Sequence, residues 1–170
     1  MTPTTQTGTA KQVYRVFIKA TPQAIWDAIT QPAWQVKYGY RAATEYDLRP
    51  GGDFRGLATE AMKEFGAPDV ILDGEVIAVD PPRRLVQTWH ALWDPEIAAE
   101  PAKRLTWEIE EGQGGVTTLT VTHELDGAPK TALTVAGADP DAGGGWAWIL
   151  SDLKTLLETG TSMQGADGTT

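Results

Sequence analysis

GGGWAWILSDLKTLLETG, residues Gly143–Gly160, is the one long segment of this chain with a helical repeat of apolar residues. The apolar side chains recur every three or four residues, which places them on one face of an α-helix. Gly160 can adopt the left-handed conformation that ends a helix, and Asp139 and Asp141 are alternative N-caps. The segment therefore predicts a long amphipathic helix. Its apolar face consists of Trp146, Ile149, Leu150, Leu153, Leu156 and Leu157, and its polar face of Ser151, Asp152, Lys154, Thr155 and Glu158.

One apolar residue of this helix, Trp148, does not follow the repeat. At about 100° per residue it projects roughly 160° away from the centre of the apolar face. Trp148 is therefore either exposed or covered by another segment. The apolar face itself needs a surface to pack against, and the rest of the chain supplies strands.

The segments before the helix alternate apolar and polar residues, as β-strands do. A first strand is expected at 13–20, and Thr21-Pro22 then predicts the start of a helix that Pro32 ends, followed by a short helix at 33–38. From Thr44 to Leu125 strand patterns repeat with connections short enough for antiparallel pairing. Further strands are expected at 44–49, 53–55, 74–79, 85–92 and 104–110, and a last one through 119–123.

This order of elements predicts an α+β helix-grip fold, because a sheet with one apolar face and a helix with one apolar face bury both by packing together. We expect a curved antiparallel sheet of about six to seven strands wrapped around the C-terminal helix, with two short helices after the first strand. The segments 93–103 and 126–142 are expected to be long irregular loops. One domain should span 13–160, between disordered polar tails at 1–12 and 161–170.

The composition narrows the class of protein. With 14 Lys and Arg against 23 Asp and Glu in 170 residues, the net charge is −9, which disfavours binding to nucleic acid or to anionic membranes. The chain has no cysteine, which excludes thiol chemistry and disulfides, and no expected signal or membrane-spanning segment, so a cytoplasmic location is predicted. The unusual total is seven tryptophans, which are suited to lining cavities as well as to filling cores.

Several local strings, in their order along the chain, resemble the SRPBCC (START-like) superfamily, and within it the branch similar to the C-terminal domain of activators of Hsp-ninety ATPase. The resemblance covers nearly all of 13–160 and implies a deep pocket between the sheet and the final helix. The superfamily includes lipid carriers, plant hormone and allergen proteins, polyketide cyclases and chaperone activators, so it constrains shape more than function. The strings are Ala20–Trp26, Pro50–Phe54, Gly74–Pro82 with Leu85 and Thr88-Trp89 after it, Thr120–Glu124, and Gly145-Trp146.

The inner face of the sheet and the start of the last helix would line such a pocket. Strand alternation places Trp107 and His123 on this face. The alternative is that the aromatic residues simply fill the core, which is the commoner role of a buried tryptophan. The other candidate lining residues are Trp34, Tyr38, Phe54, Gln87, Trp89 and Trp146, with Glu75 and Arg55 as weaker ones.

His123 is the residue with the most chemical potential, since a neutral imidazole on an apolar face can bind a ligand carbonyl or hydroxyl. The competing interpretation is a core histidine whose hydrogen bonds are satisfied within the protein. His90 has the opposite strand parity and should lie outside. Two histidines on different strands without a carboxylate pair are a poor basis for a metal site, so we expect neither a metal nor another cofactor.

Three functions remain open on these grounds. The leading hypothesis is a noncatalytic protein that binds a small, mostly apolar molecule such as a lipid or a polyketide. The second is a cochaperone that activates an Hsp-ninety type ATPase, and the third is a cyclase-like or hydrolase-like enzyme with His123 as general acid or base. The third is the weakest, because no carboxylate is predicted to orient the histidine. Both a monomer and a homodimer are compatible with the open edges of the sheet.

Overall fold

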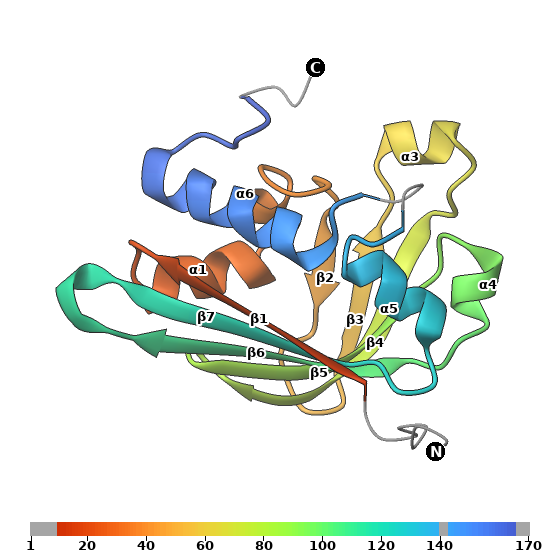
Figure 1. Ribbon diagram of the computed structural model, residues 1–170, viewed down its shortest axis with the longest axis horizontal. Coiled ribbons are helices and arrows are strands. Elements are labelled where there is room, and N and C mark those ends of the chain that lie inside the picture. The colour runs from red at the N-terminus through yellow and green to blue at the C-terminus, as the bar shows by residue number, and fades with distance from the viewer. Residues whose placement is uncertain (1–9, 140–142, 166–170) are drawn as a thin grey trace, which may run out of the picture.

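The computed structural model describes residues 10–139 and 143–165, and its main layer is a curved antiparallel sheet of seven strands (Figure 1). The strands lie in the order β1-β7-β6-β5-β4-β3-β2, so β1 and β2 form the two edges. Every neighbouring pair is antiparallel, as the short connections predict. The strands are β1 (Lys11–Ile18), β2 (Thr44–Tyr46), β3 (Asp53–Leu57), β4 (Val70–Asp80), β5 (Arg84–Ala91), β6 (Lys103–Glu111) and β7 (Thr117–Glu124).

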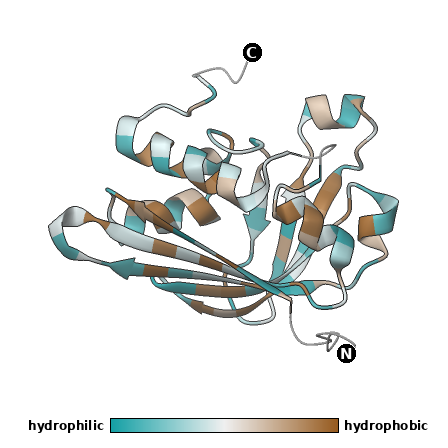
Figure 2. Ribbon diagram, in the orientation of Figure 1, coloured by the Kyte–Doolittle hydropathy of each residue, from teal (hydrophilic) through white to brown (hydrophobic). Residues whose placement is uncertain are grey.

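The long helix α6 (Gly145–Thr159) lies across one face of this sheet, next to α1 (Pro22–Thr30) (Figure 1). Hydrophobic and hydrophilic residues alternate along the central strands, which gives the sheet one apolar face toward the helices (Figure 2). Leu150, Leu153 and Leu156 of α6 are at most 5% exposed and belong to the same core as the inner residues of the strands. The predicted helix-grip architecture is therefore confirmed.

The ends of the helices follow local chemistry. Thr21 caps α1 by accepting a hydrogen bond from the Ala24 amide at 3.1 Å, and α2 (Pro32–Gln35) begins at the proline that ends α1. Gly160 ends α6 in the left-handed conformation, at φ 84°. The N-cap of α6 is Gly144 without a side-chain bond, so the expectation for Asp139 is wrong, and Asp141 lies outside the described residues.

Three short helices were not expected from the sequence. Two of them, α4 (Pro95–Ala98) and α5 (Pro129–Val135), lie in the segments 93–103 and 126–142 that we read as irregular loops, so this reading is wrong in part. The third, α3 (Glu60–Glu64), connects β3 to β4. Each is two turns or less, which is too short for an apolar repeat to show in the sequence.

A buried carboxylate on α6 corrects the predicted polar face. Asp152 is 0% exposed and accepts hydrogen bonds from the Gly39 amide at 2.9 Å, the Ser162 hydroxyl at 2.8 Å and the Met163 amide at 2.8 Å. Gln164 Nε2 donates to the same carboxylate at 2.7 Å. Residues 161–165, which we expected to belong to a tail, are thus folded back against α6. At the other end, Lys11 and Gln12, also expected in a tail, belong to β1 and pair with β7.

Trp148 is half-buried because Tyr40 covers it. The two rings lie 5.0 Å apart between centroids and are tilted by 31°. The turn that carries Tyr40 thus covers the one tryptophan of α6 outside its apolar face. In the described ranges, 10–139 and 143–165, no helix is long and apolar enough to cross a bilayer.

Candidate functional site

Four aromatic side chains from four elements meet between the sheet and α6. Trp89 of β5, Trp107 of β6, His123 of β7 and Trp146 of α6 are each at most 7% exposed. Their rings meet edge to face, with centroids 5.1 Å apart for Trp89 and His123 and 5.4 Å for Trp107 and Trp146. Edge-to-face contact is the favourable geometry for aromatic quadrupoles. We call these four residues the aromatic cluster.

His123 is fully buried in the aromatic cluster, and its tautomer follows from its neighbour. Trp146 Nε1 donates to His123 Nδ1 at 3.1 Å. An indole nitrogen can only donate, so Nδ1 is the acceptor and the proton of the neutral ring is on Nε2. The Nε2 atom is buried and has no hydrogen-bond partner in the part of the chain that the structure describes. The site therefore contains one buried donor without an acceptor.

The imidazole is neutral at physiological pH. Burial, together with the positive charge of Lys103, lowers the pKa of His123 to about 4 from an ordinary value of 6.5. Lys103 lies at the start of β6 and its own ammonium is 3.1 Å from Asp126. A protonated His123 would place a second cation near Lys103 in an apolar environment, which is why the ring resists protonation.

A second set of polar atoms lies at the Trp107 side of the cluster. The Gln87 side chain is fully buried, and its Oε1 accepts from Trp107 Nε1 at 3.3 Å and from the Tyr46 hydroxyl at 2.7 Å. Tyr46 in turn stacks on Phe54 at 4.7 Å. Burial, and then the neighbouring Tyr38, raise the pKa of Tyr46 above its ordinary value, so this hydroxyl is a neutral donor. Tyr46 was missed as a site residue, although its alternation within 44–49 and its position opposite Phe54 could have indicated it.

The remaining predicted residues have other partners than the four rings. The Tyr38 hydroxyl donates to the Ala28 carbonyl at 2.8 Å, and Trp34 is half-buried with Lys37 Nζ 4.6 Å from its ring centre. Arg55 and Glu75 are exposed on the outer face of the sheet, beside an open hollow of about 480 Å³. The structure thus brings together Gln87, Trp89, Trp107, His123 and Trp146, with Phe54 linked through Tyr46, whereas Trp34 packs at the border of the same core.

His90 lies on the outer side, as its parity predicted. Its Nδ1 is 3.2 Å from Asp73 and its Nε2 is 2.9 Å from the Ala98 carbonyl, so it fastens α4 to the sheet. Across the described residues no three His, Cys, Asp or Glu side chains gather in a way that could hold a metal ion.

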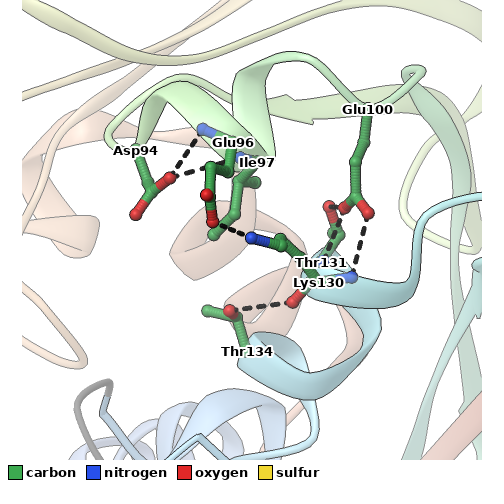
Figure 3. A network of polar contacts seen from close by, with 7 residues as sticks. All are labelled: Asp94, Glu96, Ile97, Glu100, Lys130, Thr131 and Thr134. Carbon is green, nitrogen blue, oxygen red and sulfur yellow. Dashed lines mark hydrogen bonds and ion pairs between the residues drawn. The ribbon is translucent and has the colours of Figure 1, made fainter.

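Helices α4 and α5 are joined to each other by a polar network at one end of the sheet (Figure 3). The Glu100 carboxylate accepts from the Lys130 amide at 2.9 Å and from the amide and hydroxyl of Thr131, both at 2.7 Å. Lys130 also forms an ion pair with Glu96 of α4 (Figure 3). We call this network the α4–α5 clasp.

Trp93, immediately before α4, connects the aromatic cluster to solvent. Its ring meets Trp89 edge-on at 5.9 Å and the residue is 37% exposed. A line of ring contacts thus runs from the surface through Trp89 to His123. The sequence analysis placed Trp93 in a loop and missed this contact.

The family comparison agrees with this architecture. The family model of the activator of Hsp90 ATPase homolog 1-like proteins matches residues 19–158. The chain belongs to this family. The match spans the first helix to the end of α6, so it includes all four residues of the aromatic cluster. A search of curated proteins gave no match.

Solved structures with the same fold include proteins of different contexts. The Aha1 dimer of Colwellia psychrerythraea is 18% identical over 89% of this chain and 98% of its own, with a TM-score of 0.63. DynU16, a putative protein of the dynemicin biosynthetic locus, is 25% identical over 89% of this chain and 48% of its own, with a TM-score of 0.63. An Hsp90 activator of Plasmodium falciparum, PFC0360w, is 19% identical over 94% of this chain and 91% of its own, with a TM-score of 0.53. At these identities the similarity shows the fold.

Proposed function

We propose that this protein binds a small, mostly apolar molecule at the aromatic cluster, without catalysing a reaction, and that His123 donates a hydrogen bond to it. The observation that carries the proposal is the unpaired, fully buried Nε2–H of His123. A buried donor without an acceptor costs about 1–3 kcal/mol. A ligand that brings an acceptor recovers this cost, and the surrounding indoles contribute apolar contact area.

The chemical class of ligand follows from the same atoms. Because Nδ1 is occupied by Trp146, only the donor side of the imidazole is free, and it selects for a carbonyl, ether or other oxygen acceptor. The three tryptophans around it favour an extended apolar or aromatic body. A polyketide-like molecule or a lipid with one carbonyl combines these features.

Binding requires the aromatic cluster to open, since the rings are in mutual contact in this conformation. The Trp89 ring lies between His123 and the exposed Trp93, so it is the ring that would have to move for a ligand to reach His123 from the surface. Opening changes the environment of three indoles at once. Intrinsic fluorescence therefore reports binding directly.

The decisive experiment compares two ligands that differ only in the acceptor. Native mass spectrometry of the purified protein first identifies any molecule that is already bound. The protein is then titrated with 2-acetylnaphthalene and with 2-ethylnaphthalene, with tryptophan fluorescence as the readout. We expect saturable binding of both and about tenfold tighter binding of the ketone, which corresponds to about 1.4 kcal/mol for one hydrogen bond.

His123→Phe is the matched variant, because it keeps a ring and removes the donor. It should lose most of the preference for the ketone, and any preference that remains belongs to the Trp146 Nε1–H, which loses its acceptor in this variant. Saturable binding of neither ligand to the wild-type protein, together with an empty native mass spectrum, would remove the proposal. An unchanged preference for the ketone in His123→Phe would move the donor elsewhere.

The noncatalytic part of the proposal rests on the partner of His123. General acid–base histidines are usually oriented by a carboxylate, whereas His123 is oriented by the Trp146 indole. With a pKa of about 4, the ring is also a weak base at neutral pH. If the native mass spectrum identifies a ligand, unchanged mass of that ligand after prolonged incubation supports binding alone, whereas conversion that His123→Ala abolishes would make the protein an enzyme.

The second candidate is a cochaperone, which the family match and the Plasmodium activator favour. It predicts that the protein binds a bacterial Hsp90 homologue and raises its ATPase rate. An unchanged ATPase rate over a range of protein concentrations, with no complex in sedimentation, would exclude this function.

A further inference from the structure

The β1 edge of the sheet carries a regular pattern of cations and apolar residues. On β1 and just after it, the side chains of the odd-numbered residues point away from the core. They are Lys11, Val13, Arg15, Phe17 and Lys19, and all are exposed, Val13 by 51% and Phe17 by 57%. The row therefore alternates a positive charge with an apolar side chain.

The backbone of the same residues faces the open edge. In an antiparallel pair, alternate residues direct their N–H and C=O groups to one neighbour or to the other. The Ala10 carbonyl accepts from Leu125, just beyond β7, whereas the Phe17 carbonyl accepts from Lys154 of α6. The even-numbered residues thus pair with β7, and the odd-numbered ones face outward.

Side chains of α6 occupy only one end of this edge. Lys154 Nζ bonds the Phe17 carbonyl at 2.7 Å and Glu158 accepts from the Lys19 amide at 2.8 Å. The edge-facing backbone groups of Lys11, Val13 and Arg15 have no such partner among the described residues. A strand edge of this length is a template for a further strand.

The charge of the row is opposite to that of the molecule. The net charge of the chain is −9, yet no described carboxylate forms an ion pair with Lys11, Arg15 or Lys19. The adjacent outer residues of β7 opposite Val13, Arg15 and Phe17 are threonines, and Glu124, opposite Lys11, pairs with Arg104. The row is therefore a positive stripe whose charges are not neutralised from within the fold.

We propose that β1 binds an extended acidic segment of a partner protein, which adds as a further strand at the Lys11–Arg15 edge. Residues that lie opposite each other in an antiparallel pair share one face. The incoming strand should therefore place acidic residues opposite Lys11 and Arg15 and an apolar residue opposite Val13. This is the pattern acidic-x-apolar-x-acidic.

A second copy of this chain does not fit the same edge. Two β1 strands paired antiparallel would gather both rows of cations on one ribbon. The cations lie opposite each other when Lys11 faces Arg15, and diagonally when Val13 faces Arg15, and neither register supplies a negative charge. Edge cations alone would also serve to keep the edge unpaired. That simpler role predicts that no strand binds, which the following experiment tests.

The probe is the capped peptide Thr-Glu-Thr-Val-Thr-Glu-Thr, titrated into ¹⁵N-labelled protein. We expect amide shifts in Lys11–Phe17 and in β7, and affinity that falls about tenfold or more as ionic strength rises from about 0.05 to about 0.3 M. The same peptide with Gln in place of Glu should bind about tenfold or more weakly. Shifts confined to the inner face would place the peptide elsewhere and overturn the proposal.

Two variants of β1 separate the contribution of backbone pairing to peptide binding from the contribution of charge. Val13→Pro removes an edge-facing N–H that β7 does not use, and should abolish binding while the fold is kept. Arg15→Glu should weaken binding about tenfold or more. Arg84→Glu is the control, because it makes the same change in net charge on the same face of β5, three strands from the edge, and should bind as the wild type does.

Circular dichroism checks that the variants are folded, and Arg15→Glu keeps the test valid if Val13→Pro is not. No binding of the acidic peptide to the wild-type protein would show that the cations only protect the edge. Concentration-dependent dimerisation in sedimentation that Val13→Pro removes would assign the edge to a second copy. Either result overturns the proposal.

Discussion

His123 stays neutral because the folded protein supplies it with rings and with a neighbouring ammonium instead of water. This has a consequence for stability that is separate from any ligand. The pKa of His123 is about 4 in the folded state and 6.5 ordinarily, so between these values the unfolded chain binds a proton that the folded chain does not. The contribution is fully present above about pH 6.5 and is lost as the pH falls through about 4.

We therefore expect the free energy of unfolding to fall by up to about 3 kcal/mol between pH 7 and pH 4 because of this residue. His123→Phe, which has no titrating ring, should lack this part of the pH dependence. Urea unfolding of both proteins from pH 7 to pH 4 measures the difference in their free energies of unfolding. The contributions of the carboxylates cancel in this difference because both proteins share them. Parallel pH curves for the two proteins would contradict a neutral, buried His123.

Asp152 of α6 is a second buried titratable residue, and its pKa shift has the opposite origin. Burial alone would raise the pKa of its carboxyl, but hydrogen bonds from Gln164, Ser162, Met163 and Gly39 outweigh burial and lower it. A lowered pKa means that the carboxylate stabilises the fold above its ordinary value of 3.8, and that this stabilisation is lost as the pH falls below it.

Asp152→Asn should destabilise the protein by about 2–3 kcal/mol at pH 7, because an amide group then faces donors that need an acceptor. Urea unfolding measures the loss, and hydrogen exchange at Met163 should rise. Asp69→Asn is the control, since the Asp69 side chain is 89% exposed, and should change stability by less than about 0.5 kcal/mol. Equal effects of the two substitutions would mean that the Asp152 bonds contribute little.

At the residue scale, strand parity was enough to place Trp107, His123 and Gln87 on the inner face. Parity works because a strand that is buried on one side has only two orientations. It could not reveal that Trp146 Nε1 meets His123 Nδ1, since that contact depends on the position of α6 over β7. It also could not reveal that Asp152 is buried, because its partners come from the turn at Gly39 and from 161–165, and neither segment carries a helix or strand pattern.

At the scale of elements, the long repeat of α6 and the proline-initiated helices α1 and α2 were predictable, and the short helices α3, α4 and α5 were not. An apolar repeat needs several turns before it can be distinguished from chance. Helices α4 and α5 instead begin with proline and are stabilised by local polar groups, Asp94 for α4 and Glu100 for α5. Such capping is a weak signal in a sequence, because Asp-Pro also begins turns.

The α4–α5 clasp makes a prediction of its own. Glu100 is the acceptor for the first amides of α5. Glu100→Gln should therefore lower the local stability of the α5 N-terminus by about 1 kcal/mol and raise hydrogen exchange at Lys130 and Thr131. Exchange measured by mass spectrometry should change little in β6 and β7. Glu64→Gln, at the exposed end of α3, is the matched control and should leave the exchange of α5 unchanged. If α5 exchanges in Glu100→Gln as it does in the wild type, then the hydrogen bond from Gln12 to the Ala132 carbonyl is sufficient to hold the helix.

At the scale of the whole molecule, the sheet and α6 share one core, so neither should be stable without the other. Leu153 is 1% exposed at the centre of the α6 contact, and Leu153→Ala should cost about 3 kcal/mol by loss of apolar contact and creation of a cavity. Because one core holds both layers, the loss should appear as a single shift of the unfolding transition. Circular dichroism and tryptophan fluorescence should then give the same midpoint.

Leu133→Ala is the control, at a residue of α5 that is 55% exposed, and its free energy of unfolding should stay within about 0.5 kcal/mol of the wild type. Separate midpoints for the two probes would instead mean that α6 undocks from an intact sheet, and that same motion would open the aromatic cluster to a ligand.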